Sequence, residues 1–275
     1  MSGILYVVGT PIGNLGDFSP RALETLEKCD FIAAEDTRVT LKLLNRFEIK
    51  KPMVSYFEHN RFERGPIIAE RLLAGENCAL VTDAGMPAIS DPGEDLVKLC
   101  IEKGIKVESV PGPCAFATAL AVSGMPSKRF TFEGFLPVEK SARREHISWL
   151  VGETRTMIFY EAPHKLSQTL SDLAAALGDR ELAIVRELTK IHEQVIKTTL
   201  CTAAEKYSKE DLKGEIVLII KGAEPETKEK MSLEQAVQYA KELAEAGESK
   251  TQAAKLAAKE SGLKKGDIYK LLTEE

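Results

Sequence analysis

Apolar runs of five or six residues alternate with longer amphipathic segments through the first 125 residues. The apolar runs predict strands at 4–8, 30–35, 53–57, 78–83 and 106–110. The longer segments predict helices at 19–28, 40–47, 65–75, 93–104 and 113–125. Continuous apolar strands separated by helices are typical of crossover units. The pattern therefore predicts an α/β domain over 1–122 with a mostly parallel sheet that is covered on both faces.

Residues 123–222 have a different rhythm and predict a second α/β domain. Strands are predicted at 129–137, 156–162, 182–188, 193–200 and 215–222, and helices at 143–152 and 164–178. Several of these strands are expected to pair antiparallel, which makes the second sheet mixed. A Pro-Gly-Pro turn and Gly124 flank the alanine-rich helix that precedes the boundary. The domains are therefore divided between 122 and 123.

The last part of the chain is helical. A polar stretch at 222–231 predicts a linker. Helical patterns follow at 232–247, 251–262 and 264–272. The last two, with a glycine turn at Gly262, resemble a helix-turn-helix. Residues 229–275 are thus expected to form a small helical tail behind the two α/β domains.

Composition narrows the range of partners and compartments. The chain is 44% hydrophobic and 29% charged, with a formal net charge of -5. A nucleic-acid partner would therefore have to meet a local basic patch. The five cysteines form no C-x-x-C pair, which argues against a zinc site and a disulfide framework and for a reducing compartment. Without a leader-like start or an apolar stretch of membrane-spanning length, a cytoplasmic protein is expected.

The first strand runs into a glycine loop of unusual spacing. Gly9, Gly13 and Gly16 form G-x-x-x-G-x-x-G. A dinucleotide fingerprint needs G-x-G-x-x-G, and a P-loop needs G-x-x-x-x-G-K-[ST]. Neither pattern fits, and the loop has no lysine to meet a triphosphate. A tight turn that needs positive φ explains the loop equally well.

Two more loops leave the carboxyl ends of predicted strands, at 82–93 and 110–116. In open α/β sheets the ligand crevice lies outside those ends. Glycine and proline let backbone groups approach a ligand closely in a fixed shape. Asp83, Asp91 and Glu94 make this rim acidic. Three such loops favour a pocket for a cationic ligand over structural turns alone.

Eight strings carry a family resemblance over about residues 4–221. They are VGTPIGNLGD (8–17), AAEDTR (33–38), SYFEHN (55–60), TDAGMPAISDPG (82–93), VPGPCA (110–115), FYEAPHK (159–165), RELTKIHE (186–193) and KGEIVLII (213–220). Together they resemble the tetrapyrrole methylase superfamily, and within it the branch that methylates a cytidine 2′-hydroxyl of small-subunit (16S) ribosomal RNA. The resemblance implies S-adenosylmethionine bound in a cleft between the two α/β domains, a homodimer, and ribosomal RNA or the 30S subunit as partner.

Carried over residue by residue, the resemblance implies a cofactor pocket built from loops of both domains. The residues are Pro11, Gly13, Asp83, Ala84, Gly85, Met86, Ala88, Ile89, Ser90, Cys114, Ala115, Tyr160, Leu188 and Glu215. Tetrapyrrole-acting members have Gly-Asp-Pro where this chain has Gly85-Met86-Pro87. That departure argues against a porphyrinoid substrate. No metal is expected in the site.

Methyl transfer to a hydroxyl needs positioning and a base within hydrogen-bond reach. Polar clusters follow four predicted strands: Glu35, Asp36 and Arg38; His59 and Asn60; Glu161 and His164; Glu187 and Lys190. From these, Asp36, Arg38 and Glu161 are predicted to be catalytic, and His59, Asn60, His164 and Lys190 to bind substrate. Simpler roles stay open, because Asp36 could cap a helix, His164 could be an exposed first-turn residue, and Arg38 or Lys190 could form a surface ion pair.

The helical tail offers the local basic patch. Residues 250–270 contain six lysines and two acidic residues, a balance of +4. Lys255, Lys264 and Lys265 are predicted to contact the RNA backbone. A solvated helix surface is the simpler reading, and a second basic patch is expected at Lys140, Arg143 and Arg144. Two other functions stay open: methylation of a tetrapyrrole precursor, and non-catalytic RNA binding in ribosome assembly.

Overall fold

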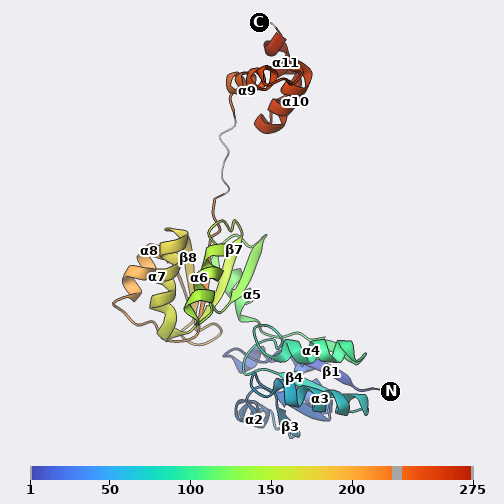
Figure 1. The fold of residues 1–275 in the computed structure, drawn as a ribbon. Coiled ribbons are helices and arrows are strands. Elements are labelled where there is room, and N and C mark those ends of the chain that lie inside the picture. The colour runs from blue at the N-terminus through green and yellow to red at the C-terminus, as the bar shows by residue number, and fades with distance from the viewer. Residues whose placement is uncertain (1, 225–230, 274–275) are drawn as a thin grey trace. The chain divides into compact units, whose positions relative to one another are not determined.

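The computed structural model describes residues 2–224 and 231–273. The chain divides into two compact units, Met1–Ala223 and Glu224–Glu275. Figure 1 shows two sheets with their helices in the first unit and a helical bundle in the second. The predicted fold class, two α/β sheets and a helical tail, is confirmed. Part of the predicted linker, 225–230, and the first two residues of the predicted tail segment, 229 and 230, lie outside the described residues, as do 274 and 275.

The first sheet is entirely parallel. Its strands are β1 (Ile4–Val8), β2 (Phe31–Ala34), β3 (Met53–Ser55), β4 (Cys78–Val81) and β5 (Lys106–Val110), in the order β3-β2-β4-β1-β5. The carboxyl ends of all five strands therefore lie along one edge, and the loops that follow them share that edge.

Helices cover both faces of the first sheet. They are α1 (Pro20–Lys28), α2 (Thr37–Arg46), α3 (Arg61–Leu73) and α4 (Gly93–Glu102). Phe31 and Ala33 of β2 pack with α3 and α4, whereas Ile32 and Ala34 pack with α1 and α2. Because side chains alternate along a strand, both faces of β2 need apolar residues, and this explains the continuous apolar runs in the sequence.

The second sheet is mixed, as predicted. Its strands are β6 (Phe130–Gly134), β7 (Thr156–Glu161), β8 (Glu181–Arg186), β9 (Gln194–Thr199) and β10 (Ile216–Ile220), in the order β6-β7-β10-β8-β9. Only β6 and β7 pair in parallel among the described strands of this sheet. One face packs against α6 (Lys140–Trp149), α7 (Leu166–Leu177) and α8 (Leu200–Tyr207). Helix α8 was not expected, because its sequence follows β9 directly; Thr199 caps it.

Helix α5 (Ala115–Ser123) covers the other face of the second sheet. Its Ala119 and Leu120 pack with Ile158, Val217 and other residues of β7, β8 and β10. The predicted division at 122/123 places this helix with the first domain, although it packs on the second sheet. The structure groups both sheets in one unit, and Ile12 of the loop after β1 packs in the same cluster as α5.

The second unit contains α9 (Leu233–Glu245), α10 (Lys250–Ser261) and α11 (Lys265–Thr273). Ser232 and Gln235 form a capping box at the start of α9. Gly262 ends α10 with φ 73°, so the predicted glycine turn is confirmed. The core of this bundle consists mainly of alanines from α9 and α10, with Ile268 and Leu272 from α11. No helix in the described ranges, 2–224 and 231–273, is long and apolar enough to cross a membrane.

Candidate functional site

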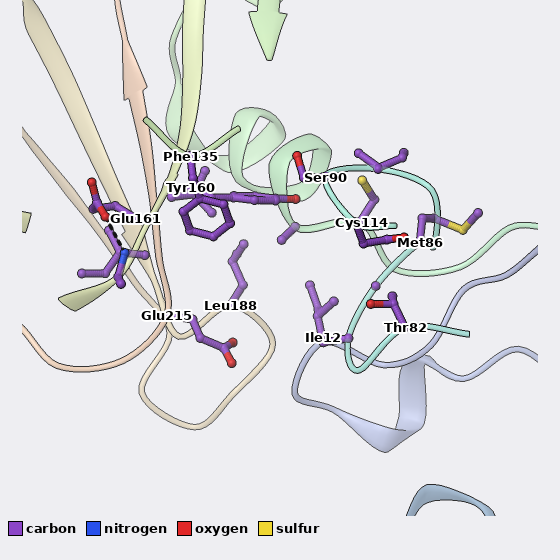
Figure 2. A pocket seen from close by; sticks show the side chains of 18 of the residues that line it. Ile12, Thr82, Met86, Ser90, Cys114, Phe135, Tyr160, Glu161, Leu188 and Glu215 are labelled. Carbon is purple, nitrogen blue, oxygen red and sulfur yellow. Dashed lines mark hydrogen bonds between the residues drawn. The ribbon is translucent and has the colours of Figure 1, made fainter. Parts of the chain in front are cut away.

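A cavity of about 410 Å³ opens where the carboxyl edge of the first sheet meets the second sheet. Figure 2 shows loop residues of the first sheet, such as Ile12 and Met86, on one side of it. Tyr160, Phe135 and Leu188 stand on the other side. The structure brings together ten of the predicted cofactor residues: Ala84, Gly85, Met86, Ile89, Ser90, Cys114, Ala115, Tyr160, Leu188 and Glu215. The volume is in the range of small-molecule sites.

The glycine loop after β1 locks against the other loops of this rim. A Cβ on Gly9 would lie 2.7 Å from the backbone nitrogen of Gly112, so only glycine lets the loops after β1 and β5 pack here. Thr10 and Gly85 exchange two backbone hydrogen bonds, of 2.9 Å and 3.2 Å, and Gly85 has φ 91°. Gly9 and Gly85 therefore serve backbone packing around a cavity. For Gly9 this agrees with the poor match of its loop to phosphate-binding patterns.

The loop after β4 is held in a strained conformation. Ala88 and Ser90 have φ of 66° and 62°, backbone angles that residues other than glycine rarely adopt. The Asp91 carboxylate accepts hydrogen bonds from the backbone N–H groups of Ala88 and Gly93, at 3.0 Å and 2.7 Å. Strain of this kind concentrates at ligand sites and persists when surrounding contacts hold it. Asp91 is such a contact.

The charge of the lining has one sign. Glu35, Asp91, Glu161 and Glu215 line the cavity, and no lysine, arginine or histidine does so within the described parts of the chain. The remaining lining is mostly apolar. Burial raises the pKa of Asp91, although its two backbone hydrogen bonds oppose the shift. A cavity with four carboxylates and no cation attracts a positively charged ligand and disfavours a phosphate.

Three of the four carboxylates are occupied by partners. Asp91 holds its own loop, as described above. Glu161 accepts hydrogen bonds from Ala162 N, at 2.8 Å, and from the Thr169 hydroxyl, and it is 5% exposed. Glu215 pairs with Lys190 Nζ at 3.1 Å. In contrast, Glu35 accepts a single hydrogen bond, at Oε2, from the neutral Thr82 hydroxyl. Among the four lining carboxylates it is thus the one that is held neither by a cation nor by a backbone N–H group of a described residue.

Aromatic rings fix the wall on the side of the second sheet. The Tyr160 hydroxyl accepts a 3.2 Å hydrogen bond from Phe116 N at the start of α5. Its ring centroid lies 5.0 Å from that of Phe132 and 5.6 Å from that of Phe135. Burial raises the pKa of Tyr160 to about 12, so the hydroxyl stays protonated at neutral pH. Tyr160 therefore forms a rigid part of the cavity wall, and its hydroxyl accepts a hydrogen bond from the first turn of α5.

Four predicted cofactor residues lie outside the cavity lining. Pro11, Gly13 and Asp83 line a neighbouring hollow of about 400 Å³, which shares Thr82 with the cavity. Ala88 lines neither the cavity nor this hollow. It belongs to the strained loop after β4 that is described above. Gly13 packs against the loop after β8, because a Cβ there would lie 2.7 Å from Lys190 Cγ.

The predicted catalytic pair Asp36 and Arg38 lies beside the cavity. Asp36 caps α2 by accepting from Arg38 N at 2.8 Å, and it also forms an ion pair with the Arg38 guanidinium at 2.6 Å. The Arg38 side-chain hydrogen bonds, with the backbone bonds, lower the pKa of Asp36 to about 2. A carboxylate with so low a pKa is a weak base. The capping role that the sequence left open is therefore present.

The predicted substrate residues occupy several places. Asn60 closes its own turn by accepting from Phe57 N and donating to the Ser55 carbonyl. His59 and His164 are exposed. Lys190 pairs with Glu187 and Glu215, each at 3.1 Å. Lys255, Lys264 and Lys265 are exposed in the second unit.

Several lining residues were missed by sequence reasoning. They are Ile12, Thr82, Phe135, Val185, Ile216 and Val217, together with Asp91 and Glu35, which were noted without being assigned to the pocket. A period-2 signal was available for two of them. Along β8 and β10, alternate residues pack with α6–α8, and the others, including Val185 and Val217, pack with α5 and face the cavity.

Comparison with known proteins agrees with this architecture. The model of the Tetrapyrrole (Corrin/Porphyrin) Methylases matches residues 4–204. The protein of Synechocystis sp. named Ribosomal RNA small subunit methyltransferase I is 47% identical over 273 residues, which are 99% of this chain and 98% of that protein. A protein of Thermotoga maritima with the same name is 47% identical over 222 residues, 81% of this chain and 100% of that protein.

A solved structure shares the fold at low sequence identity. It is the uroporphyrin-III C-methyl transferase from Thermus thermophilus complexed with S-adenyl homocysteine. The TM-score is 0.54 at 18% identity, over 80% of this chain and 97% of that one. With most of its length matched by the family model and by relatives at 47% identity, this chain belongs to the tetrapyrrole methylase family and, within it, to the group named ribosomal RNA small subunit methyltransferase I.

Proposed function

We propose that this chain transfers the methyl group of S-adenosylmethionine to the 2′-hydroxyl of a cytidine in small-subunit ribosomal RNA. The observation that carries the proposal is the charge of the cavity lining, which among the described residues includes four carboxylates and no basic side chain. S-adenosylmethionine carries a sulfonium and an ammonium group, so this lining fits it. The names of the relatives, and the S-adenyl homocysteine named with one structural neighbour, support the same cofactor and an RNA substrate.

The residues of the cavity would hold and orient the cofactor. When bound, the cofactor supplies an electrophilic methyl group, and the chain has to place the acceptor oxygen in line with it. The loop after β4 and the start of α5 offer backbone groups at Ala84 and Ala115. Tyr160 and Leu188 would close the opposite wall. Because most of this lining is already fixed by hydrogen bonds and packing, little ordering would be needed on binding.

A carboxylate is proposed to take the proton of the acceptor hydroxyl. Glu35 is the best placed, since it lines the cavity and its one partner among the described residues is the neutral Thr82 hydroxyl. Glu161 would position the turn after β7 through Ala162 and Thr169. Asp36 and Arg38 stay predicted members of the site, with the exposed Arg38 guanidinium suited to a phosphate of the acceptor strand.

RNA docking is proposed to involve the second unit as well. Lys255, Lys264 and Lys265 project from α10, the turn after it, and α11, and all three are exposed. Lysines on a helical surface engage phosphates without reading sequence. His59, Asn60, His164 and Lys190 remain predicted substrate contacts. A homodimer is proposed from the family resemblance.

Labelled cofactor tests the reaction. Wild-type protein is incubated with methyl-tritiated S-adenosylmethionine and 30S subunits from a strain that lacks this gene. We expect label in the 16S RNA, released by alkali as a dinucleotide that begins with cytidine, because a 2′-O-methyl group blocks alkaline cleavage at its own nucleotide. Label in mononucleotides would mean base methylation, and label in an added porphyrinoid would favour a tetrapyrrole substrate. No transfer, together with no thermal stabilisation by the cofactor, would favour a non-catalytic RNA-binding protein.

A further inference from the structure

A second concave surface lies next to the cavity, between α6 and α7. This α6–α7 groove has a volume of about 780 Å³. Its rim carries Lys140, Arg143, Arg144 and Lys165, and the only carboxylate among the described lining residues is Asp172. Its floor is mostly apolar, with Leu136, Ile147 and Val151 among the lining residues. The net charge of this lining is thus opposite to that of the cavity.

Three of the four cations are available for a ligand. Arg143 is occupied, because its guanidinium lies 2.7 Å from Asp172 Oδ2 and donates to the Thr169 hydroxyl at 2.8 Å. Lys140, Arg144 and Lys165 are exposed, and none of them forms an ion pair with another described residue within 4.0 Å. Glu139 precedes Lys140 in the sequence, and Glu145 follows Arg144. The Glu139 carboxylate caps α6 by accepting hydrogen bonds from Ser141 N and Ala142 N. Its charge therefore faces the helix N-terminus.

The groove and the cavity adjoin each other through two short segments of chain. In the loop after β6, Phe135 lines the cavity and Leu136 lines the groove. After β7, Pro163 lines the cavity and Lys165 lines the groove. One hydrogen bond links the two walls, from the Thr169 hydroxyl of the groove to the Glu161 carboxylate of the cavity. A strand whose reacting ribose enters the cavity can therefore continue directly into the groove.

An exposed aromatic side chain stands at the junction of the cavity and the groove. Phe135 lines the cavity there and is 57% exposed. Proteins that hold single-stranded nucleic acid combine a basic groove with rings on which bases stack. An acidic peptide would need the cations but would have no use for exposed rings.

A relative that is shorter than this chain points to the same unit. The Thermotoga maritima protein is matched over 100% of its length by 222 residues of this chain. That length corresponds to the first unit, Met1–Ala223. A protein of that size with the same name has no room for the helical bundle, so the surface that receives its substrate has to lie on the two-sheet unit.

We infer that the α6–α7 groove binds the phosphate backbone of the RNA strand that flanks the methylated nucleotide, with Lys140, Arg144 and Lys165 as the contacts. The inference rests on the proposed function and adds where the RNA runs. The groove would hold single-stranded RNA, since its cations can follow one backbone while a base stacks on Phe135.

The test compares two triple variants with the same change of charge. The groove variant is Lys140→Gln, Arg144→Gln and Lys165→Gln. The control variant is Lys50→Gln, Lys98→Gln and Lys103→Gln, three exposed lysines that line neither the groove nor the cavity. Affinity for a fluorescein-labelled C12 RNA is measured at several salt concentrations, along with the KM for 30S subunits and cofactor affinity by calorimetry.

We expect the groove variant to bind C12 about tenfold more weakly and to lose about 2 from the slope of log affinity against log salt, because each single-strand phosphate contact contributes about 0.7. Its KM for 30S subunits should rise with kcat and cofactor affinity unchanged. The control variant should match wild type. Equal RNA affinity and slope in wild type and the groove variant would overturn the inference, as would a change of oligomeric state in sedimentation, which would make the groove an interface between copies of this chain.

Failure of the proposed function gives a different result. If wild type binds C12 through the groove but transfers no methyl group to 30S subunits, the proposed reaction is wrong and the RNA surface stands. If wild type methylates 30S subunits and the groove variant does so with unchanged KM, the reaction stands and the groove assignment is wrong.

Discussion

The cavity and the α6–α7 groove adjoin each other at the segments after β6 and β7, yet their linings carry opposite charge. The cavity lining has four carboxylates and no cation among the described residues, whereas the groove has four cations and one carboxylate. The two sets of charges come from different segments. Glu35 and Asp91 follow strands of the first sheet, whereas Lys140, Arg143 and Arg144 belong to α6. A methyltransferase for RNA needs both kinds of surface, one for a cationic cofactor and one for a polyanionic substrate.

The largest effect is expected from filling the cavity while leaving the groove intact. Ala84 is an exposed loop residue that lines the cavity, so Ala84→Trp should weaken S-adenosylmethionine binding by at least about 100-fold without unfolding the protein. In differential scanning fluorimetry, wild type at about 100 times Kd should gain about 5–10 °C in Tm, and the variant almost nothing. Ala74→Trp, at an exposed residue beyond α3, is the control. Unchanged cofactor binding in Ala84→Trp would remove the cavity as the cofactor site.

The next effect separates the four cavity carboxylates from one another. Glu35→Gln keeps the shape of the side chain but removes its basicity, so kcat should fall about 100-fold while Kd for the cofactor changes little. Glu215→Gln is the matched control, because it also removes one cavity carboxylate but one that is paired with Lys190. Single-turnover methyl transfer to 30S subunits measures both. If the two variants lose the same activity, Glu35 has no special role as proton acceptor.

Deleting the helical unit measures how much RNA affinity the first unit, with the groove, keeps by itself. A chain that ends after residue 223 keeps both sheets and their cores. We expect cofactor affinity within about twofold of the full chain, because the cavity lies entirely within the first unit. Affinity for 30S subunits should fall about tenfold with the loss of Lys255, Lys264 and Lys265. Equal losses of cofactor and RNA binding would show that the helical unit supports the whole fold.

The smallest effect is expected on the alkylation rate of a cavity cysteine, which reports whether the bound ligand covers that residue. Burial raises the pKa of the Cys114 thiol, which lines the cavity, so its alkylation by N-ethylmaleimide should be slow. S-adenosylhomocysteine at about four times its Kd should slow it about fivefold further. Cys201 is exposed on α8 and outside the cavity lining, and it serves as the internal control in the same mass spectrum. Equal protection of both thiols would mean that the ligand changes the whole protein and does not specifically cover Cys114.

The sequence predicted the sheets far better than the details of the site. Continuous apolar runs identify buried strands directly, and all ten predicted strands are present. Helix α8 was missed because no turn signal separates it from β9, whose last residue is also its cap. Placement of α5 could not be predicted either, since a uniformly apolar helix gives no face to assign to one sheet.

Loop residues show where sequence reasoning about the site ends. The strings around Gly85 and Ala115 placed the cavity at the correct edge, because carboxyl ends of parallel strands share one rim. The role of each polar group depends on its partners, which spacing does not show. Asp36 and Glu35 are adjacent in the sequence, but Asp36 is held by a helix end and an arginine while Glu35 faces the cavity.

The alanine core of the helical bundle has a consequence for its local stability. Ala236, Ala240, Ala253, Ala254 and Ala257 let α9 and α10 approach closely, but each methyl group removes little apolar area from water. Such a domain has a small margin against opening, and its amides would exchange with deuterium long before those of the two sheets. Binding of RNA to its lysines would therefore also stabilise the bundle. The bundle would then open least often in the RNA-bound state.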